Sequence, residues 1–128
     1  GLAISPDGSA LFVTDSANHN IRRVELATGT VTAIAGSGER GDADGVGGAA
    51  EFRCPWGVTV SPDGALFVAD GSALFVADCD NHKIRRVEVA TGEVTTLAGI
   101  GGEPGNADGV GEAAQFFDPG RIAISPDG

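Results

Sequence analysis

Methionine and tyrosine are absent from this chain, and aromatic residues make up only 5% of its 128 positions. Basic residues are also scarce, with 8 Lys and Arg against 18 Asp and Glu, which gives a formal net charge of −10 at pH 7. A protein of this charge repels phosphate backbones and anionic lipid head groups. We therefore expect neither a nucleic acid nor a membrane among its partners.

Long apolar runs are missing too, since none approaches the ~20 residues that a membrane-spanning helix needs. The 2 cysteines, Cys54 and Cys79, are too far apart for a CxxC motif and too few for a disulfide framework. We interpret both as structural thiols. The chain starts at Gly1 without an initiator Met or a signal peptide, which suggests an excised segment and assigns it no compartment.

Glycine and β-branched residues are abundant by contrast. The chain has 21 glycines and 41% hydrophobic residues, and Val, Thr and Ile recur in short runs. This composition favours short strands joined by tight turns, and the hydrophobic content is enough for one core. The sequence predicts an all-β protein.

An internal repeat is the strongest signal in the chain. The turn sequence SPDG starts at Ser5, Ser61 and Ser125, and the residues between successive turns match at most positions. The second interval is longer than the first by one copy of GSALFVAD, residues 71–78. The doubled strand is therefore an insertion into a regular repeat, and the close match indicates recent duplication or deliberate design.

Each repeat reads as four strands separated by turn residues. Residues 57–61 (GVTVS) end at a Pro-Asp-Gly turn, and residues 73–78 (ALFVAD) form a wholly apolar strand. Residues 84–90 (IRRVEVA) alternate between apolar and charged side chains, and residues 93–99 (EVTTLAG) are less hydrophobic. Two buried strands followed by two more solvent-exposed strands are typical of a β-propeller blade.

A long glycine-rich connection follows each set of strands, at residues 36–56 and 99–120. The two connections share DGVG, AA and a Phe at matching places, so we expect ordered segments that pack on one end of the blades. Phe52 and Phe116 are expected to fill the crevice between neighbouring blades.

Two runs identify a family, TDSANHNIRRVELATGTVTAIAG at residues 14–36 and ADCDNHKIRRVEVATGEVTTLAG at residues 77–99. With the connection GDADGVGGAAEF and the PWGV that follows, they resemble NHL repeats, which build β-propellers of, most often, about six blades. Arg121, which replaces the glycine found at Gly57, and the inserted strand depart from the family pattern. The most specific residues of the resemblance, to which it assigns a structural role, are Asn18, His19, Arg22, Asn81, His82 and Arg85.

On this basis the chain divides into three parts. Residues 1–56 form a first blade with its connection. Residues 57–119 form a second blade, into which the strand copy 71–78 is inserted, and residues 120–128 repeat the first strand as the start of a further blade. We expect one strand copy in the blade and the other in a loop or an intermolecular strand, and a regular hairpin through Asp70-Gly71 is the alternative.

The aspartates of the first connection invite a calcium interpretation. Asp42 and Asp44 begin a DADG run, but Val46 and Arg53 stand where an EF-type loop needs oxygen ligands. We expect instead a turn in which Asp side chains accept backbone N–H bonds.

The histidines and the other charged residues are interpreted structurally as well. His19 and His82 lie in separate blades, where one zinc ion cannot readily collect both. Asp15 and Asp78 are expected to anchor loops, and the Arg-Arg doublets to form solvated charge pairs with the glutamates that follow them. The sequence thus predicts no catalytic residue, no cofactor and no metal site.

Two blades cannot close a ring, so we expect the chain to associate with copies of itself, as a homotrimer first and a homodimer or homotetramer next. The residues expected at the assembly surface are Leu2, Ile4, Leu66, Phe67, Leu74, Phe75, Ile122 and Ile124. The C-terminal strand is expected to cross into the next subunit as a clasp.

The function predicted is therefore a non-enzymatic propeller scaffold that self-assembles, with protein partners on its loop faces. The alternative is a propeller enzyme or metal-binding module of the lactonase or lyase type, with its site in the central channel.

Overall fold

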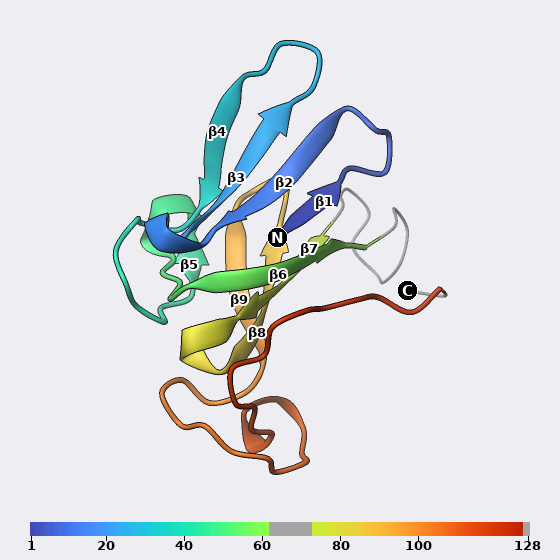
Figure 1. The fold of residues 1–128 in the computed structure, drawn as a ribbon. Helices are drawn as coiled ribbons and strands as arrows, with labels where there is room; N and C mark the ends of the chain where they lie inside the picture. Colours follow the sequence, from blue (N-terminus) through green and yellow to red (C-terminus); the bar gives the residue numbers. More distant parts are fainter. Residues whose placement is uncertain (62–72, 127–128) are drawn as a thin grey trace.

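The computed structural model describes residues 1–61 and 73–126 of the chain. They form two twisted antiparallel sheets, with the first connection at one end of the second sheet and the second connection beyond that sheet (Figure 1). The prediction of an all-β protein is confirmed. The helical turns of the described residues are all too short to cross a bilayer.

The first sheet has four strands in sequence order, each antiparallel to the next. Its strands are β1 (Leu2–Ile4), β2 (Ala10–Asp15), β3 (Asn20–Glu25) and β4 (Val31–Ala35). The Ser-Pro-Asp-Gly turn joins β1 to β2, and the Ser5 backbone N–H donates to the Ala10 carbonyl at 2.8 Å to close it. Turn chemistry and strand propensity therefore agree along this repeat.

The second sheet repeats this order and adds a strand. It contains β6 (Pro55–Val60), β7 (Ala73–Asp78), β8 (Lys83–Glu88) and β9 (Glu93–Ala98). The two-residue strand β5 (Gly45–Val46), which belongs to the first connection, pairs with the outer edge of β9. The predicted blade of four strands thus becomes a sheet of five, because the preceding connection extends it.

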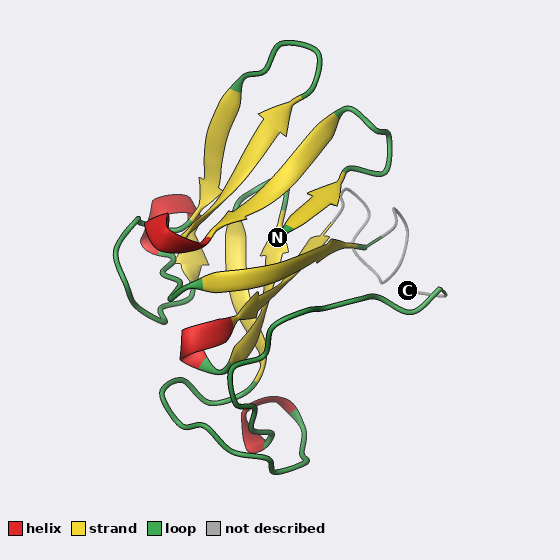
Figure 2. Cartoon of the chain, viewed as in Figure 1, coloured by secondary structure: helices red, strands yellow, loops and turns green. Residues whose placement is uncertain are grey.

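Four 3-10 turns complete the secondary structure of the described residues (Figure 2). η1 (Ser16–Asn18) and η3 (Cys79–Asn81) follow the second strand of each blade. η2 (Gly47–Ala49) and η4 (Gly111–Ala113) occupy equivalent places in the two connections. The repeat therefore extends to the loops and is not limited to the strands.

The doubled strand has one copy in the blade. β7 consists of the second copy and lies between β6 and β8, antiparallel to both. The first copy, with the predicted assembly residues Leu66 and Phe67, lies outside the described residues.

The C-terminal segment runs past the second sheet. A Cβ added at Gly1 would overlap the carbonyl oxygen of Trp56, and one added at Gly57 would overlap that of Gly120. The chain near Gly120 therefore approaches β6 as the chain near Trp56 approaches β1. Residues 120–126 form no strand among the described residues, so a further first strand at residues 120–128 stays a prediction.

The core lies between the two sheets. The residues of this single buried cluster are Phe12, Ile21, Ala35, Ala50, Phe52, Val58, Leu74, Val76, Val87 and Val94. Side chains alternate between the faces of a strand, so each sheet contributes one of its two faces to this core and leaves the other turned away from it.

Candidate functional site

The inter-blade interface joins two different faces of the repeat. The first blade contributes Phe12, Ile21 and Ile34, which we call the trailing face. The second blade contributes what we call the leading face, the residues Leu74, Val76, Val87 and Val94, each at most 1% exposed. The blades therefore stack trailing face to leading face.

Each blade has both kinds of face. The trailing face of the second blade and the leading face of the first blade do not take part in the buried interface and are partly exposed. On the second blade the trailing-face equivalents are Phe75, Ile84 and Leu97, of which Leu97 is 52% exposed. On the first blade the leading-face equivalents are Leu11, Val13, Val24 and Val31, of which Val31 is 43% exposed. The molecule thus presents, at its two ends, the two halves of the interface that it buries in its middle.

A fully buried arginine is the polar centre of the interface. Arg85 on β8 is 0% exposed and donates from Nη1 to Asp78 Oδ2 at 2.7 Å and from Nη2 to Asp44 Oδ1 at 2.9 Å. It also donates to the carbonyl oxygens of Ala43 and Glu51, and its guanidinium lies 5.0 Å from the ring centroid of Phe52. Arg85 therefore holds the first connection to the second blade.

Asp78 is the second buried member of this network. Its carboxylate accepts the Arg53 backbone N–H at 2.8 Å and the Asn81 side-chain amide at 2.8 Å, in addition to Arg85. Burial raises the pKa of Asp78 from its ordinary value, although these donors oppose the shift. The Asn81 amide also donates to the carbonyl of Gly41 at 2.6 Å. Asp78 thus binds the Arg53 end of the connection directly, and Asn81 binds its Gly41 end.

Asp44 joins the connection to β9 and does not form the local turn that the sequence suggested. Its carboxylate accepts the Thr96 hydroxyl at 2.9 Å and the Thr96 backbone N–H at 3.2 Å. Burial raises the pKa of Asp44, but the bonds from Arg85 and Thr96 outweigh burial and leave it below its ordinary value. Asp42 nearby forms an ion pair with Lys83 at 3.3 Å. The carboxylates of this run bind side chains of the next blade and leave the calcium interpretation without support.

The doublets separate into two kinds of arginine. Arg23 and Arg86 pair with Glu25 and Glu88 on the same strand, at 3.1 Å and 2.8 Å. Arg85 is instead fully buried, so the expectation of a solvated charge pair does not describe it. The reason is the connection preceding the second blade, which covers the strand from outside.

The first blade carries the same motif without that cover. Arg22 donates to Asp15 at 3.2 Å, but the two side chains are 40% and 23% exposed, whereas those of Arg85 and Asp78 are both 0% exposed. The Asn18 amide donates to Asp15 at 2.9 Å, as Asn81 does to Asp78. The motif is therefore preformed before any neighbour covers it.

The two histidines connect the blades to the ends of the connections. Nδ1 of His19 accepts the backbone N–H of Cys54 at 3.1 Å, and Nδ1 of His82 accepts that of Asp118 at 3.2 Å. All four residues have a left-handed backbone, with φ between 48° and 58°. Residues other than glycine rarely adopt this backbone conformation. These bonds hold each connection to its own blade.

Cys54 directly precedes β6 and Cys79 begins η3, and both are half-buried free thiols. Burial raises the pKa of both thiols, and the carboxylate of Asp80 adds to the shift. Within residues 1–61 and 73–126, one group, formed by Cys79, Asp80 and Asp118, brings three potential metal-ligand atoms within 4.8 Å of one another. Both carboxylates are exposed, and sequence reasoning missed the group because Asp118 is distant along the chain.

The predicted assembly residues fall into two sets. Leu2 and Ile4 are 67% and 58% exposed, as an assembly surface requires. Leu74 is 0% exposed within the chain, so it already packs against the first blade and is not available to a second copy.

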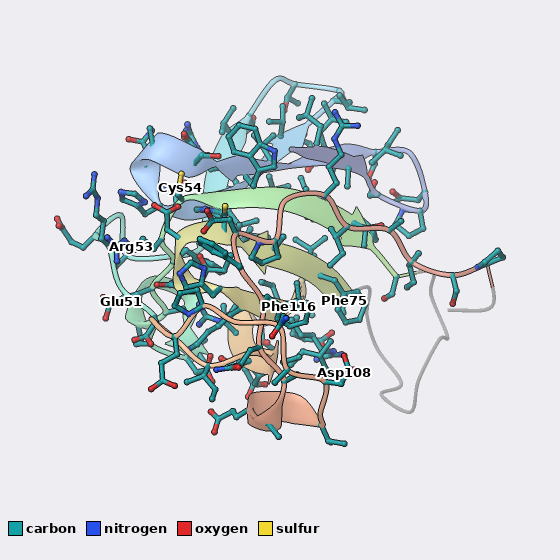
Figure 3. All side chains as sticks on the ribbon, turned by 60° about the horizontal axis from the view of Figure 1, so that its bottom comes forward. Glu51, Arg53, Cys54, Phe75, Asp108 and Phe116 are labelled. Carbon is teal, nitrogen blue, oxygen red and sulfur yellow. The ribbon has the colours of Figure 1, made fainter. Side chains whose placement is uncertain are left out.

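Phe75, Ile122 and Ile124 line a groove of about 410 Å³ between the second sheet and the C-terminal segment. Figure 3 shows Phe75 and Phe116 on this side of the molecule, and Glu51, Arg53 and Cys54 grouped at the first connection. The groove is largely apolar and lies on the open trailing face.

Comparisons with known proteins agree with this geometry. Residues 1–107 match the family described as SMP-30/gluconolactonase/LRE-like region. The chain is 37% identical over 138 residues to NHL repeat-containing protein 2 of Bos taurus, covering 100% of this chain and 18% of that protein. It is 32% identical over 136 residues to the chloroplastic protein SUPPRESSOR OF QUENCHING 1 of Arabidopsis thaliana, covering 100% of this chain and 12% of that protein. The chain thus spans only a small part of the length of these relatives.

Solved structures share the fold. An auxiliary nutrient binding protein from Bacteroides thetaiotaomicron superposes with a TM-score of 0.84 at 26% identity, covering 98% of this chain and 32% of that one. One from Bacteroides ovatus superposes with a TM-score of 0.80 at 27% identity, covering 95% and 31%. The chain therefore belongs to the SMP-30/gluconolactonase/LRE-like region family and consists of NHL-type β-propeller repeats.

Proposed function

We propose that this chain is a non-enzymatic propeller scaffold that associates with copies of itself, trailing face to leading face, to close a ring of blades. The observation that carries the proposal is the correspondence between the buried interface and the two open faces. Phe12 is 1% exposed in the buried interface. Its equivalent Phe75 is half-buried on the open trailing face, where a leading face of another copy could cover it.

The open faces supply the driving force. They expose Val31 and Leu97 at 43% and 52%, and burying apolar surface contributes about 25 cal/mol per Å². The contact is heterologous, since the two faces differ, and a heterologous contact forms a closed ring when its rotation closes. A homotrimer is the first expectation, and a homodimer or homotetramer follows.

The C-terminal segment fits the same scheme. Ile122 and Ile124 form one wall of the open groove, next to β6 and Phe75. β1 of an incoming copy, with the closely similar sequence LAIS, needs this place beside β6. The two segments therefore compete, and ring closure requires IAIS either to replace β1 of the neighbour or to move aside.

The oligomeric mass tests the proposal directly. Light scattering after size-exclusion chromatography is expected to show a discrete oligomer that dissociates on dilution. Val13→Asp and Ile84→Asp each place a charge on one open face and are expected to give folded monomers. Thr28→Asp, in the exposed β3–β4 turn, is the matched control and is expected to assemble normally. A wild-type chain that stays monomeric at high concentration contradicts the proposal.

Protein partners on the loop faces are part of this proposal. The connections carry ordered, exposed side chains such as Val110, which is 90% exposed. A ring would display several copies of this surface on one side, and multivalent display raises avidity without new contacts.

An enzyme is the second candidate, and the family match favours it, because the family description includes a gluconolactonase. The ring axis would then carry the site, where β1 and β6 lie. Lactone hydrolysis assayed with and without added divalent cations decides between the two candidates. Cation-dependent turnover by the assembled protein would support the enzyme.

A further inference from the structure

The connection between the blades is a docking element with a defined receptor. Its receptor on the second blade is formed by Arg85 with Asp78, by Lys83, and by the edge of β9. The elements that dock are Asp44, which binds Arg85, and Asp42, which binds Lys83. The chain thus shows how this kind of connection recognises the blade that follows it.

The second connection has the same fold but no receptor in the described chain. Its Gly105 N–H donates to the Phe116 carbonyl at 3.0 Å, and the equivalent bond from Gly41 to Phe52 in the first connection is 3.2 Å. Its Gln115 N–H donates to the Ala107 carbonyl at 2.9 Å. The equivalent bond from Glu51 to Ala43 is also 2.9 Å. The second connection therefore has its docking shape already.

The docking side chain of the second connection is Asp108, the equivalent of Asp44. Asp108 is exposed, and Figure 3 shows it on the second connection, away from the Cys54 end of the molecule. The matching receptor residue is Arg22, whose side chain is 40% exposed and forms an ion pair with Asp15. One copy of the chain thus offers the carboxylate and another offers the guanidinium.

A paired substitution distinguishes this second interface from the first. Where the buried interface has Lys83 with Asp42, the equivalent positions on the two open ends are Asn20 and Asn106. Oδ1 of Asn20 is buried and has no hydrogen-bond partner among the described residues, whereas Asn106 is exposed. A buried acceptor without a donor is costly, and an Asn106 amide placed as Asp42 is placed would supply the donor. Asparagine thus replaces both the lysine and the aspartate of the internal ion pair, so the two open ends remain complementary to each other.

We infer that the receptor around Arg22 and Asn20 binds the second connection of another copy of this chain, through Asp108 and Asn106. The inference rests on the proposed self-association. It adds the polar contact that would fix how the second connection of one copy is positioned on the first blade of the next. Ala33 stands at the position of Thr96, which donates to the docked carboxylate of Asp44, so the external contact keeps the backbone N–H of β4 but lacks the hydroxyl bond. The external interface is therefore the weaker of the two.

Charge reversal tests the contact. Arg22→Glu alone and Asp108→Arg alone are each expected to raise the dissociation constant of the oligomer about tenfold or more, measured by sedimentation velocity. In a ring of three, an equimolar mixture of the two variants leaves at least one contact between like charges. The double variant restores opposite charges at each contact and is expected to regain most of the affinity. Glu112→Arg is the matched control, because its equivalent Gly48 faces open space in the internal interface.

The asparagine pair gives an independent test. Asn20→Asp with Asn106→Asp places two carboxylates together and is expected to weaken assembly, whereas Asn20→Lys with Asn106→Asp recreates the internal ion pair and is expected to preserve or strengthen it. Far-UV circular dichroism and thermal melting verify that each variant folds. Wild-type assembly that these substitutions leave unchanged overturns this inference and leaves self-association intact. A monomeric wild type overturns both.

Discussion

Arg22 and Arg85 stand in nearly the same sequence, yet Arg22 is partly exposed to solvent and Arg85 is fully buried. Both follow an Asn-His pair, both bind an aspartate at the end of the second strand, and both begin an Arg-Arg doublet. The side chain of Arg22 is 40% exposed and that of Arg85 is 0% exposed. A blade therefore does not bury its own arginine; the connection from the preceding blade does so.

The apolar faces show the same asymmetry. Phe12 is 1% exposed because the second blade covers it, and Phe75 in the equivalent place is only partly covered by the C-terminal segment. Equivalent residues therefore differ in environment according to whether a neighbour stands beside them.

The largest effect is expected from truncating the sealed arginine. Arg85→Ala leaves the buried Asp78 without its cation, so we expect a loss of about 3–5 kcal/mol in the free energy of unfolding. Arg22→Ala removes a partly exposed pair, and in dilute monomer we expect a loss below about 1 kcal/mol. Urea denaturation of both variants measures the contrast. Equal losses would show that the connection does not determine the energetics of the motif.

The two phenylalanines give the next contrast. Phe12→Ala creates a cavity in the buried interface, and we expect it to cost about 3–5 kcal/mol of unfolding free energy. Phe75→Ala removes a partly exposed ring and is expected to cost clearly less in the monomer while weakening assembly. The contrast fails if the two variants unfold at the same urea concentration when both are monomeric.

A smaller effect is expected from the aspartate that docks the connection. The pKa of Asp44 lies below its ordinary value of 3.8 in the folded state, so its stabilisation is present above that value and is lost as the pH falls through the folded pKa. Asp44→Asn is expected to remove about 1 kcal/mol or less at pH 7, since the carboxylate is partly exposed. The free energy of unfolding of Asp44→Asn should therefore approach that of the wild type in acid, and urea denaturation at several pH values measures this.

Asp108→Asn is the matched control for this titration. In dilute monomer its carboxylate has no receptor among the described residues, so we expect stability at pH 7 to stay within error of the wild type. A loss equal to that of Asp44→Asn would mean that the two connections are equivalent in the monomer.

The smallest effect concerns the Ser-Pro-Asp-Gly turn of the first blade. Hydrogen bonds from Ser5 and Ser9 lower the pKa of Asp7 to about 2. Ser9→Ala removes one of the hydroxyl donors, at 2.8 Å, and is expected to raise that pKa toward 3.8 without changing the fold. An NMR titration of the Asp7 carboxyl carbon measures the shift, and an unchanged midpoint would contradict it.

Much of the fold was predictable because its signals are local. The alternation in IRRVE, the Pro-Asp-Gly turns and the wholly apolar ALFVAD run each specify a strand or turn from neighbouring residues alone. The role of Asp78 as a loop anchor followed from its place at a strand end. The burial of Arg85 was missed because nothing adjacent to it in sequence shows that Asp44 and Glu51 reach it.

The signal that could have found the buried network lies in the connection. Asp42 and Asp44 precede Lys83 and Arg85 with the same two-residue spacing, and in the other pair of positions Asn106 and Asp108 correspond to Asn20 and Arg22. Comparing each connection with the blade that follows it, in place of comparing blade with blade, exposes this match.

By itself the sequence determined that the chain is made of two near-identical units of short strands, because propensity, turn chemistry and apolar periodicity act over a few residues. The three-dimensional packing was needed to show which arginine is buried, which phenylalanine is covered and which copy of the doubled strand forms part of the sheet. Burial of a face depends on the neighbour that stands against it, and that neighbour comes from a distant part of the chain.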